Sequence, residues 1–472
     1  MSSADNPLTD SPLDGFSNLR ELTRVALPLM LSAGTQSLMN AADRIILAGC
    51  SEDALAAVTP ASMLHWTIVC VPMGTVLYAN TFIAQFEGAG QKDRMLSSFW
   101  QSVWLAVVSG FLLWMFVPFS RMFLPLSGHS PGVVELEAQY FNTLCAGAPV
   151  HMLGTALSCF FSGRRRTNVV MLNSMAAVVV NGILSYLLAY GVGPIPAMGI
   201  RGAALGTIAA RCIELGIYIL WILRESKRDM LPLWSTCALD RELLKQFLRY
   251  GVPSGLHYFV DVSGFTMFLL IVGNLNNQAL AATNIAFSIN GLIFIPLLGF
   301  GTAIQTVVGH NIGAGRIDAA RMTTQNAAMM GVAWTGVMGI VLVFFPEFML
   351  RPFFLLADPS MSGGANIASL VKTAAYLLNF VAAYSVFDAL AVVFSSALRG
   401  AGDTVFPMLI TLFSSWLIMV VPALIIIQSD HASILALWLT CTAHISFSGI
   451  CMLIRYMSGR WQKIHLTETY VG

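Results

Sequence analysis

The sequence predicts an all-α polytopic membrane protein, with about twelve transmembrane helices in two parallel-repeat six-helix bundles. Of the 472 residues, 56% are hydrophobic and 10% are charged, whereas soluble domains carry about 25% charged residues. The chain also divides into about twelve apolar runs, each long enough to cross a bilayer about 30 Å thick. In addition, the second half of the chain repeats sequence features of the first half. Together these observations favour a two-lobed membrane protein.

The predicted elements start after a polar N-terminal segment without an apolar signal-peptide core. Asn18 and Glu21 have the spacing of a capping box, which predicts the start of the first helix. The spans are predicted near residues 20–49, 55–85, 95–125, 134–163, 167–192, 198–224, 243–273, 280–311, 318–350, 367–399, 403–428 and 432–458. A polar, basic segment containing Pro232 separates the sixth span from the seventh.

These boundaries predict five parts of the chain. They are a disordered cytoplasmic tail (1–15), an N-terminal lobe (16–224), a cytoplasmic connector (225–242), a C-terminal lobe (243–460) and a second cytoplasmic tail (461–472).

The basic residues fall mostly on one side of the membrane when the spans are threaded alternately. With the N-terminus inside, nineteen lysines and arginines lie in cytoplasmic segments and four lie on the opposite side. Cytoplasmic loops carry such an excess of basic residues, so we expect both termini in the cytoplasm.

The two halves align at an offset of 225 residues, which becomes 237 later in the chain. The matches include Arg24 with Arg249, Pro28 with Pro253, residues 88–90 with 313–315, Asn142 with Asn379, and Thr167 with Thr404. Each copy has an even number of spans, so both copies start on the same side and the repeat is parallel. Two such lobes around a central cleft are typical of alternating access in a secondary transporter. Since the sequence has no Walker-type phosphate loop, ion gradients rather than nucleotide hydrolysis should drive it.

Several other classes of function are disfavoured. The net charge of +1 argues against a nucleic-acid partner. None of the eight cysteines forms a C-x-x-C pair, which argues against a metal or disulfide framework. The sequence has neither the H-E-x-x-H nor the G-x-S-x-G motif of hydrolases, so we do not expect an enzyme.

Acidic residues within the predicted spans mark the candidate site. Asp261 lies roughly 18 Å along the helix from Arg249, close to the middle of a bilayer. A carboxylate there costs about 3 kcal/mol and usually has a function. Asp388 reaches a similar depth, and Asp43 lies within the first span. His257, one turn before Asp261, is either a cation or proton relay or a packing histidine.

Four stretches make the chain resemble the multidrug and toxin extrusion (MATE) family, in particular its NorM-like branch, over essentially its whole length. They are Pro28…Gln36…Asp43, Gly-Ala-Gly-(Gln/Arg)-x-Asp after the second and eighth spans, Gly199–Thr207, and Leu398–Thr404.

The resemblance implies a multidrug antiporter of the bacterial inner membrane. It would exchange small organic, mostly cationic, compounds for Na⁺ or H⁺, without a further cofactor, and we expect a monomer surrounded by membrane lipid. The family positions of the coupling-cation site correspond to Asp261 and Asp388, where Asp261 replaces the Glu that is common there. These two acids would be the Na⁺ ligands if Na⁺ is the coupling ion. We expect His257 and Tyr258 to be the other two residues of the coupling-cation site. In the N-terminal lobe the resemblance implies a proton or substrate site at Asp43, Asn181, Thr207 and Gln36.

Either ion fits the two acids, because one Na⁺ or one shared proton relieves the repulsion between them.

Two alternative functions remain for the chain. A flippase for lipid-linked saccharides, from the same superfamily, should have a strongly basic cleft, whereas here the charges within the spans are mostly acidic. An intramembrane enzyme would turn over a lipid substrate without a gradient.

Overall fold

The computed structural model describes residues 15–124, 129–192, 194, 196–355, 364–429, 432–464 and 466. Its secondary structure in these ranges is helical, without a β-strand, which confirms the predicted all-α class. The helices of the first half are α1 (Gly15–Ala48), α2 (Glu52–Leu77), α3 (Ala79–Gly88), α4 (Lys92–Trp114), η1 (Val117–Phe119), α5 (Ser120–Phe123), α6 (Pro131–Gly163), α7 (Thr167–Tyr190) and α8 (Gly199–Arg228). Those of the second half are α9 (Arg241–Leu275), α10 (Asn277–Gly313), α11 (Ile317–Phe344), α12 (Pro346–Leu355), α13 (Gly364–Ala401), α14 (Val405–Phe413), η3 (Ser414–Val420), α15 (Val421–Ile427), α16 (Ile434–Met457) and η4 (Arg460–Lys463).

Each predicted span corresponds to one helix or to a run of consecutive helices. Eleven helical segments of the described chain are long and apolar enough to cross a membrane, and α1 is the predicted span that is not among them. α1 contains Arg20, Arg24, Asp43 and Arg44, which lower its hydropathy. Its length of 34 residues is nevertheless sufficient to span a bilayer.

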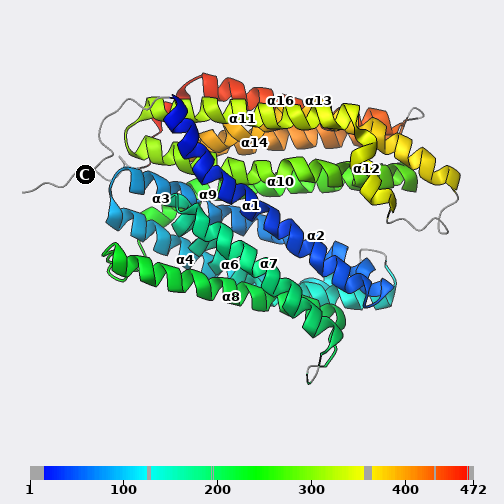
Figure 1. The fold of residues 1–472 in the computed structure, drawn as a ribbon, viewed down its shortest axis with the longest axis horizontal. Coiled ribbons are helices and arrows are strands. Elements are labelled where there is room, and N and C mark those ends of the chain that lie inside the picture. The colour runs from blue at the N-terminus through cyan, green and yellow to red at the C-terminus, as the bar shows by residue number, and fades with distance from the viewer. Residues whose placement is uncertain are drawn as a thin grey trace, which may run out of the picture.

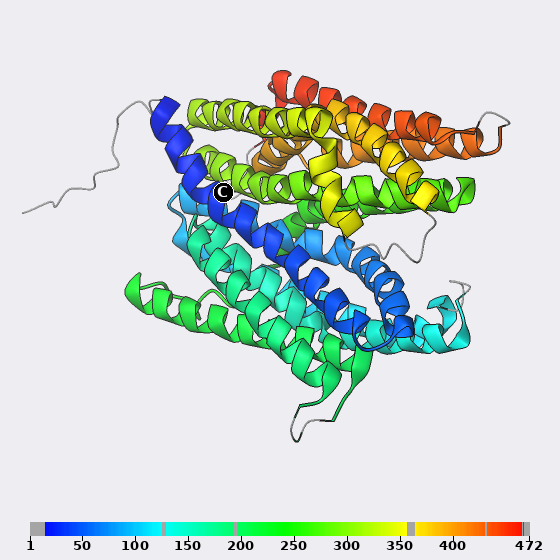
Figure 2. The ribbon, with the colours of Figure 1, turned by 45° about the vertical axis from the view of Figure 1, so that its right-hand side comes forward.

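The helices form two groups (Figures 1 and 2). α3, α4, α6, α7 and α8 lie in one group, and α10, α11, α13, α14 and α16 lie in the other. α1 runs diagonally between the groups and packs against both α7 and α10. α9 likewise packs against α2 as well as against α14. The first helix of each half therefore holds the two groups together.

The predicted capping box at Asn18 and Glu21 is wrong. α1 begins at Gly15, so Asn18 lies inside the helix, where its own backbone needs no cap. The Asn18 amide instead donates to Thr323 Oγ1 at 3.0 Å on α11, in the other half. Glu21 pairs with Arg165. Both side chains therefore make tertiary contacts rather than a local cap.

The two halves contact each other closely at the helix ends that we predict to be cytoplasmic. A Cβ on Gly74 of α2 would lie 2.7 Å from the Cα of Gly255 on α9, so this crossing needs glycine on both sides. Asn80 donates to Thr306 Oγ1 at 2.7 Å, and the rings of Phe82 and Phe247 stack with centroids 4.7 Å apart. The structure is therefore closed on this side.

The predicted connector, residues 225–242, covers the last turn of α8, an irregular segment of turns and the start of α9. This irregular segment lies along α4. The indole nitrogen of Trp100 donates to Leu233 O at 2.7 Å, and that of Trp104 donates to Cys237 O at 3.0 Å. Asp240 caps α9 by accepting from Leu243 N at 3.0 Å. The connector is thus fixed to the N-terminal group of helices.

Candidate functional site

The first polar site lies in the N-terminal half, around Asp43 of α1. One carboxylate oxygen accepts from Thr207 Oγ1 at 3.0 Å, and the other accepts from Asn181 Nδ2 at 3.5 Å. Asn181 Nδ2 also lies 3.2 Å from Ser185 Oγ, and Ser185 donates to Ala203 O. Asp43 is 4% exposed, and Asn181 and Ser185 are fully buried. The structure therefore brings together three predicted residues, Asp43, Asn181 and Thr207.

Close helix packing builds this network. Asn181 and Ser185 lie one turn apart on α7, so they face the same neighbours. A Cβ on Gly206 of α8 would lie 2.5 Å from Ser185 N, so only glycine lets α8 approach this closely. The next residue, Thr207, is thereby held against Asp43. This explains why the Gly199–Thr207 stretch is rich in small residues.

The predicted residue Gln36 lies elsewhere, at a neighbouring cavity of about 230 Å³. Its carbonyl oxygen accepts from Arg211, and Arg211 pairs with Glu214 at 2.7 Å. His151 also lines the cavity. Gln36 also donates to Asn40 Oδ1 at 3.3 Å on the same helix, and no hydrogen bond joins it to Asp43 in the described chain. The cavity thus contains one acid and one base that already neutralise each other.

The second polar site lies in the C-terminal half, where α9 carries Asp261 and α13 carries Asp388. Both side chains are half-buried, and their charges are close enough to interact. Within the described ranges, neither carboxylate has a hydrogen bond or an ion pair. Two acids without a base are unfavourable in a membrane interior unless a cation or a proton joins them.

Other polar atoms near these acids also have no partner in the described chain. They are Nδ1 of His257, the hydroxyl of Tyr384, Oγ of Ser415 and Nδ1 of His444. Tyr384 lies one turn before Asp388 on α13, and Ser415 packs against Gly264 of α9. These atoms could bind an ion or a substrate, since buried polar groups normally have hydrogen-bond partners.

The helical geometry is irregular beside the acid pair. Residues Ser414–Val420 form a π-helical segment between α14 and α15, and this segment packs against α9 and α16. π-helical segments occur frequently at functional sites. This one turns Ser415 towards α9 rather than towards lipid.

The remaining predicted cation-site residue, Tyr258, points to the closed interface between the halves. The guanidinium of Arg399 lies 5.3 Å from its ring centroid. No hydrogen bond joins Tyr258 to either acid in the described chain. No group of three or more His, Cys, Asp and Glu that could hold a metal ion occurs among the described residues.

Sequence reasoning missed Tyr384, Ser415 and His444. His444 could have been found, because it is an ionisable residue near the middle of the predicted span 432–458. Ser415 could not, because the π-helical segment that orients it leaves no mark in the residue pattern.

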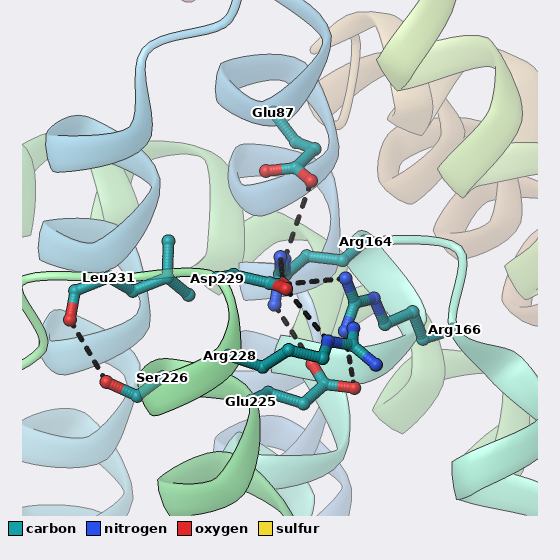
Figure 3. Close-up of polar contacts among 8 residues, drawn as sticks. All are labelled: Glu87, Arg164, Arg166, Glu225, Ser226, Arg228, Asp229 and Leu231. Atoms are coloured by element: carbon teal, nitrogen blue, oxygen red, sulfur yellow. Dashed lines mark hydrogen bonds and ion pairs between the residues drawn. The ribbon is translucent and has the colours of Figure 1, made fainter.

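A cluster of ion pairs fixes the predicted cytoplasmic end of the N-terminal half (Figure 3). Arg164, 5% exposed, pairs with Glu225 at 3.0 Å, with Asp229 at 2.9 Å and with Glu87 at 3.4 Å. Arg166 pairs with Asp229 at 2.7 Å. Desolvation opposes the charged form of Asp229, but hydrogen bonds from Arg228 and Arg164 outweigh it and lower the pKa of Asp229 below its usual value.

The chain matches the family model described as MatE over residues 28–187 and 253–425. It is similar to a "Probable multidrug resistance protein NorM" of Thermotoga maritima, with 27% identity over 94% of this chain and 93% of that protein. A protein of the same description from Neisseria meningitidis serogroup B is 26% identical over 92% and 93%.

Solved structures show the same fold. One, described as the "outward-facing conformation of a multidrug resistance MATE family transporter of the MOP superfamily", superposes with a TM-score of 0.84 at 20% identity, covering 97% of this chain and all of that chain. A MOP superfamily transporter from Pyrococcus furiosus, described as having a binding pocket of reversed polarity, gives 0.84 at 21% identity, covering 96% of this chain and all of that chain.

Proposed function

The chain belongs to the MatE family of membrane transporters, and on that premise we propose that it exports small organic, mainly cationic, compounds in exchange for Na⁺ or H⁺. It is not an enzyme. The relatives described as multidrug resistance proteins support the proposed substrate class. The site supports the proposed exchange.

One observation carries the proposal, namely that the charges of Asp261 and Asp388 interact and that neither acid has an ion pair with a basic residue in the described chain. A resident base would neutralise the acids permanently and leave nothing to exchange. Without one, the site binds either the coupling cation or a cationic substrate, but not both strongly. Competition for one negative site is sufficient for antiport when access alternates between the two sides.

The cycle then follows from electrostatics. In the state open to the outside, Na⁺ or H⁺ loads onto the acid pair and removes the negative charge that attracted the substrate, so the substrate leaves. Reorientation and release of the cation inside restore the charge for the next substrate. For release inside, the two halves rock apart at the contacts that close this side, among them Gly74 with Gly255.

The N-terminal site has a different role in this proposal. Asp43 already accepts hydrogen bonds from Thr207 and Asn181, so it adjusts the polarity of the substrate cavity next to Gln36. A proton on Asp43 would rearrange the same network.

The proposed setting is a bacterial inner membrane, with the closed side and both termini in the cytoplasm and the protein acting as a monomer. The excess of basic residues on that side supports this orientation. A lipid-linked saccharide flippase is less well supported, because Arg211, the arginine at the cavity, is already paired with Glu214. An intramembrane enzyme has no support from the family.

Efflux from proteoliposomes tests the proposal. Vesicles loaded with a fluorescent organic cation are given an inward Na⁺ gradient at fixed pH, and separately an inward proton gradient without Na⁺. We expect one of the two gradients to drive release, with Na⁺ favoured. If neither gradient moves any organic cation of a broad panel, the antiporter proposal is wrong.

A further inference from the structure

A groove that no part of the proposed cycle uses lies between α1 and α7, at the predicted cytoplasmic end. Its volume is about 550 Å³, and it is formed by Arg20, Thr23, Arg24 and Leu27 of α1 together with Asn168 of α7. A groove of this size between two membrane helices can hold part of a lipid.

The basic residues of this groove are free. Arg20 and Arg24 lie four residues apart, so their guanidinium groups share one face of α1. Both side chains are exposed, and neither has an ion pair in the part of the chain that the structure describes. The nearest acid on α1, Glu21, is already paired with Arg165. Two adjacent cations without a counter-charge favour an anion.

The groove continues into an apolar track. Leu27 and Leu31 are 55% and 50% exposed on α1, and Leu172 and Met175 are 58% and 50% exposed on α7. They follow the arginines and Asn168 at helical spacing, towards the membrane interior. A ligand with an anionic head and an apolar tail would match both parts.

The repeat provides an internal comparison. At the offset of 225, Arg20 and Arg24 correspond to Lys245 and Arg249, so the second half keeps both charges. At the offset of 237, Asn168 corresponds to Val405, so the polar wall opposite them is lost. In addition, Arg249 is stacked on Tyr250, with 5.7 Å to the ring centroid. The basic pair is thus common to both halves, whereas the complete groove is particular to α1 and α7.

We propose that this groove binds an anionic glycerophospholipid of the membrane leaflet on the closed side. The phosphate lies between the guanidinium groups of Arg20 and Arg24, the Asn168 amide donates to the head group, and one acyl chain follows Leu27 and Leu172. The lipid bridges α1 and α7. Because α1 also bonds Thr323 through Asn18 in the same turn, bound lipid favours the closed arrangement of the two halves.

Lipid retention in mixed nanodiscs tests the proposal without any transport assay. Wild-type protein is placed in nanodiscs of equal phosphatidylglycerol and phosphatidylcholine, and retained lipids are counted by native mass spectrometry. We expect one phosphatidylglycerol molecule to be retained. Arg20→Gln/Arg24→Gln should weaken its retention about 25-fold, because each arginine contributes about fivefold near an anionic membrane surface.

The matched control is Lys245→Gln/Arg249→Gln, which removes the same charges at the same spacing and should retain the lipid. Arg20→Lys/Arg24→Lys should also retain it. Asn168→Asp changes only the exposed wall of α7 and should lose it, so the proposal is testable even if the arginine variant folds poorly.

Three results would overturn the proposal. Equal loss in the Lys245/Arg249 control would mean a general attraction between basic residues and the leaflet. Full retention by Asn168→Asp and by Arg20→Gln/Arg24→Gln would mean that the lipid lies elsewhere. Displacement of the lipid by millimolar inorganic phosphate would mean a site for free anions.

Discussion

The acidic sites of the two halves differ in what surrounds them. Asp43 in the first half is almost fully buried and accepts hydrogen bonds from Thr207 and Asn181. Asp261 and Asp388 in the second half are half-buried, their charges interact, and neither has a hydrogen bond from the described chain. The described chain therefore supplies hydrogen-bond donors to the first carboxylate and leaves the second pair for a bound cation or proton.

This difference distinguishes a carboxylate that stabilises the fold from carboxylates that act in transport. A carboxylate with permanent hydrogen-bond partners stabilises the fold, so the protein is destabilised when that carboxylate is replaced by a neutral group. A carboxylate without partners costs stability, and such a cost is retained where the charge has a function. The same Asp→Asn substitution should therefore act in opposite directions at the two sites.

The largest effect is expected at the acid pair. Asp261→Asn and Asp388→Asn should each reduce gradient-driven efflux to the level of protein-free vesicles, because the amide keeps the size but removes the charge. Their free energy of unfolding should rise by about 1–3 kcal/mol, because a half-buried charge without a partner in the described chain is removed. Efflux and unfolding are measured on the same preparations. The exposed carboxylate of Asp318, changed to Asn, is the control and should leave both unchanged.

The next largest effect is expected at the ion-pair cluster, where every charge has a partner. Arg164→Met should destabilise the protein by about 3–5 kcal/mol. Three carboxylates, those of Glu87, Glu225 and Asp229, lose the buried guanidinium that joins them, and Glu225 keeps only Arg166. The control is Arg228→Gln, whose exposed side chain should cost less than about 1 kcal/mol. Both are measured as free energies of unfolding in detergent. Equal losses of unfolding free energy in the two variants would contradict the expectation that a buried ion pair contributes more than an exposed one.

Asp43→Asn should have an intermediate effect, opposite in sign to that at the acid pair. The new amide turns an N–H group towards Thr207 or Asn181, so one buried hydrogen bond is lost, which costs about 1–3 kcal/mol. Efflux should fall less than in the acid-pair variants. If Asp43→Asn were more stable than wild type and had lost all efflux, it would behave like the acid-pair variants. The proposed difference between the two acidic sites would then be wrong.

The smallest effect is the pH dependence of the cluster. The pKa of Asp229 is lower in the folded state than in the unfolded state, so its contribution is complete above the unfolded value of about 4 and is lost as the pH falls further. Because Asp229 is partly exposed, we expect no more than about 1 kcal/mol. Asp229→Asn should therefore be less stable than wild type at pH 7, and the difference should shrink below about pH 4. If the difference in unfolding free energy between wild type and Asp229→Asn stayed constant down to pH 3, the lowered pKa of Asp229 would not be its cause.

Much of the fold followed from the sequence because membrane insertion imposes simple constraints. Apolar length and the repeat located the helices to within a few residues, as with α7, predicted at 167–192 and observed at Thr167–Tyr190. The charges within the spans identified Asp43, Asp261 and Asp388 for the same reason, since each is costly in lipid.

The rest depended on tertiary geometry that no local pattern contains. Asn18 had the pattern of a cap but bonds across the two halves. The family resemblance groups Gln36 with Asp43, but the direction of the Gln36 side chain is set by Arg211. The isolation of Asp261 from hydrogen-bond donors depends on which residues α13 and the π-helical segment place around it.

The central claim is that the coupling cation and the substrate compete for Asp261 and Asp388. The most direct measurement is displacement of a bound fluorescent organic cation from purified protein, at constant ionic strength, by Na⁺ and separately by acid. Wild type and Asp43→Asn should release the dye with one of these titrants, while Asp261→Asn and Asp388→Asn should keep whatever dye they bind. Normal displacement from both acid-pair variants, or loss of displacement only in Asp43→Asn, would contradict the account.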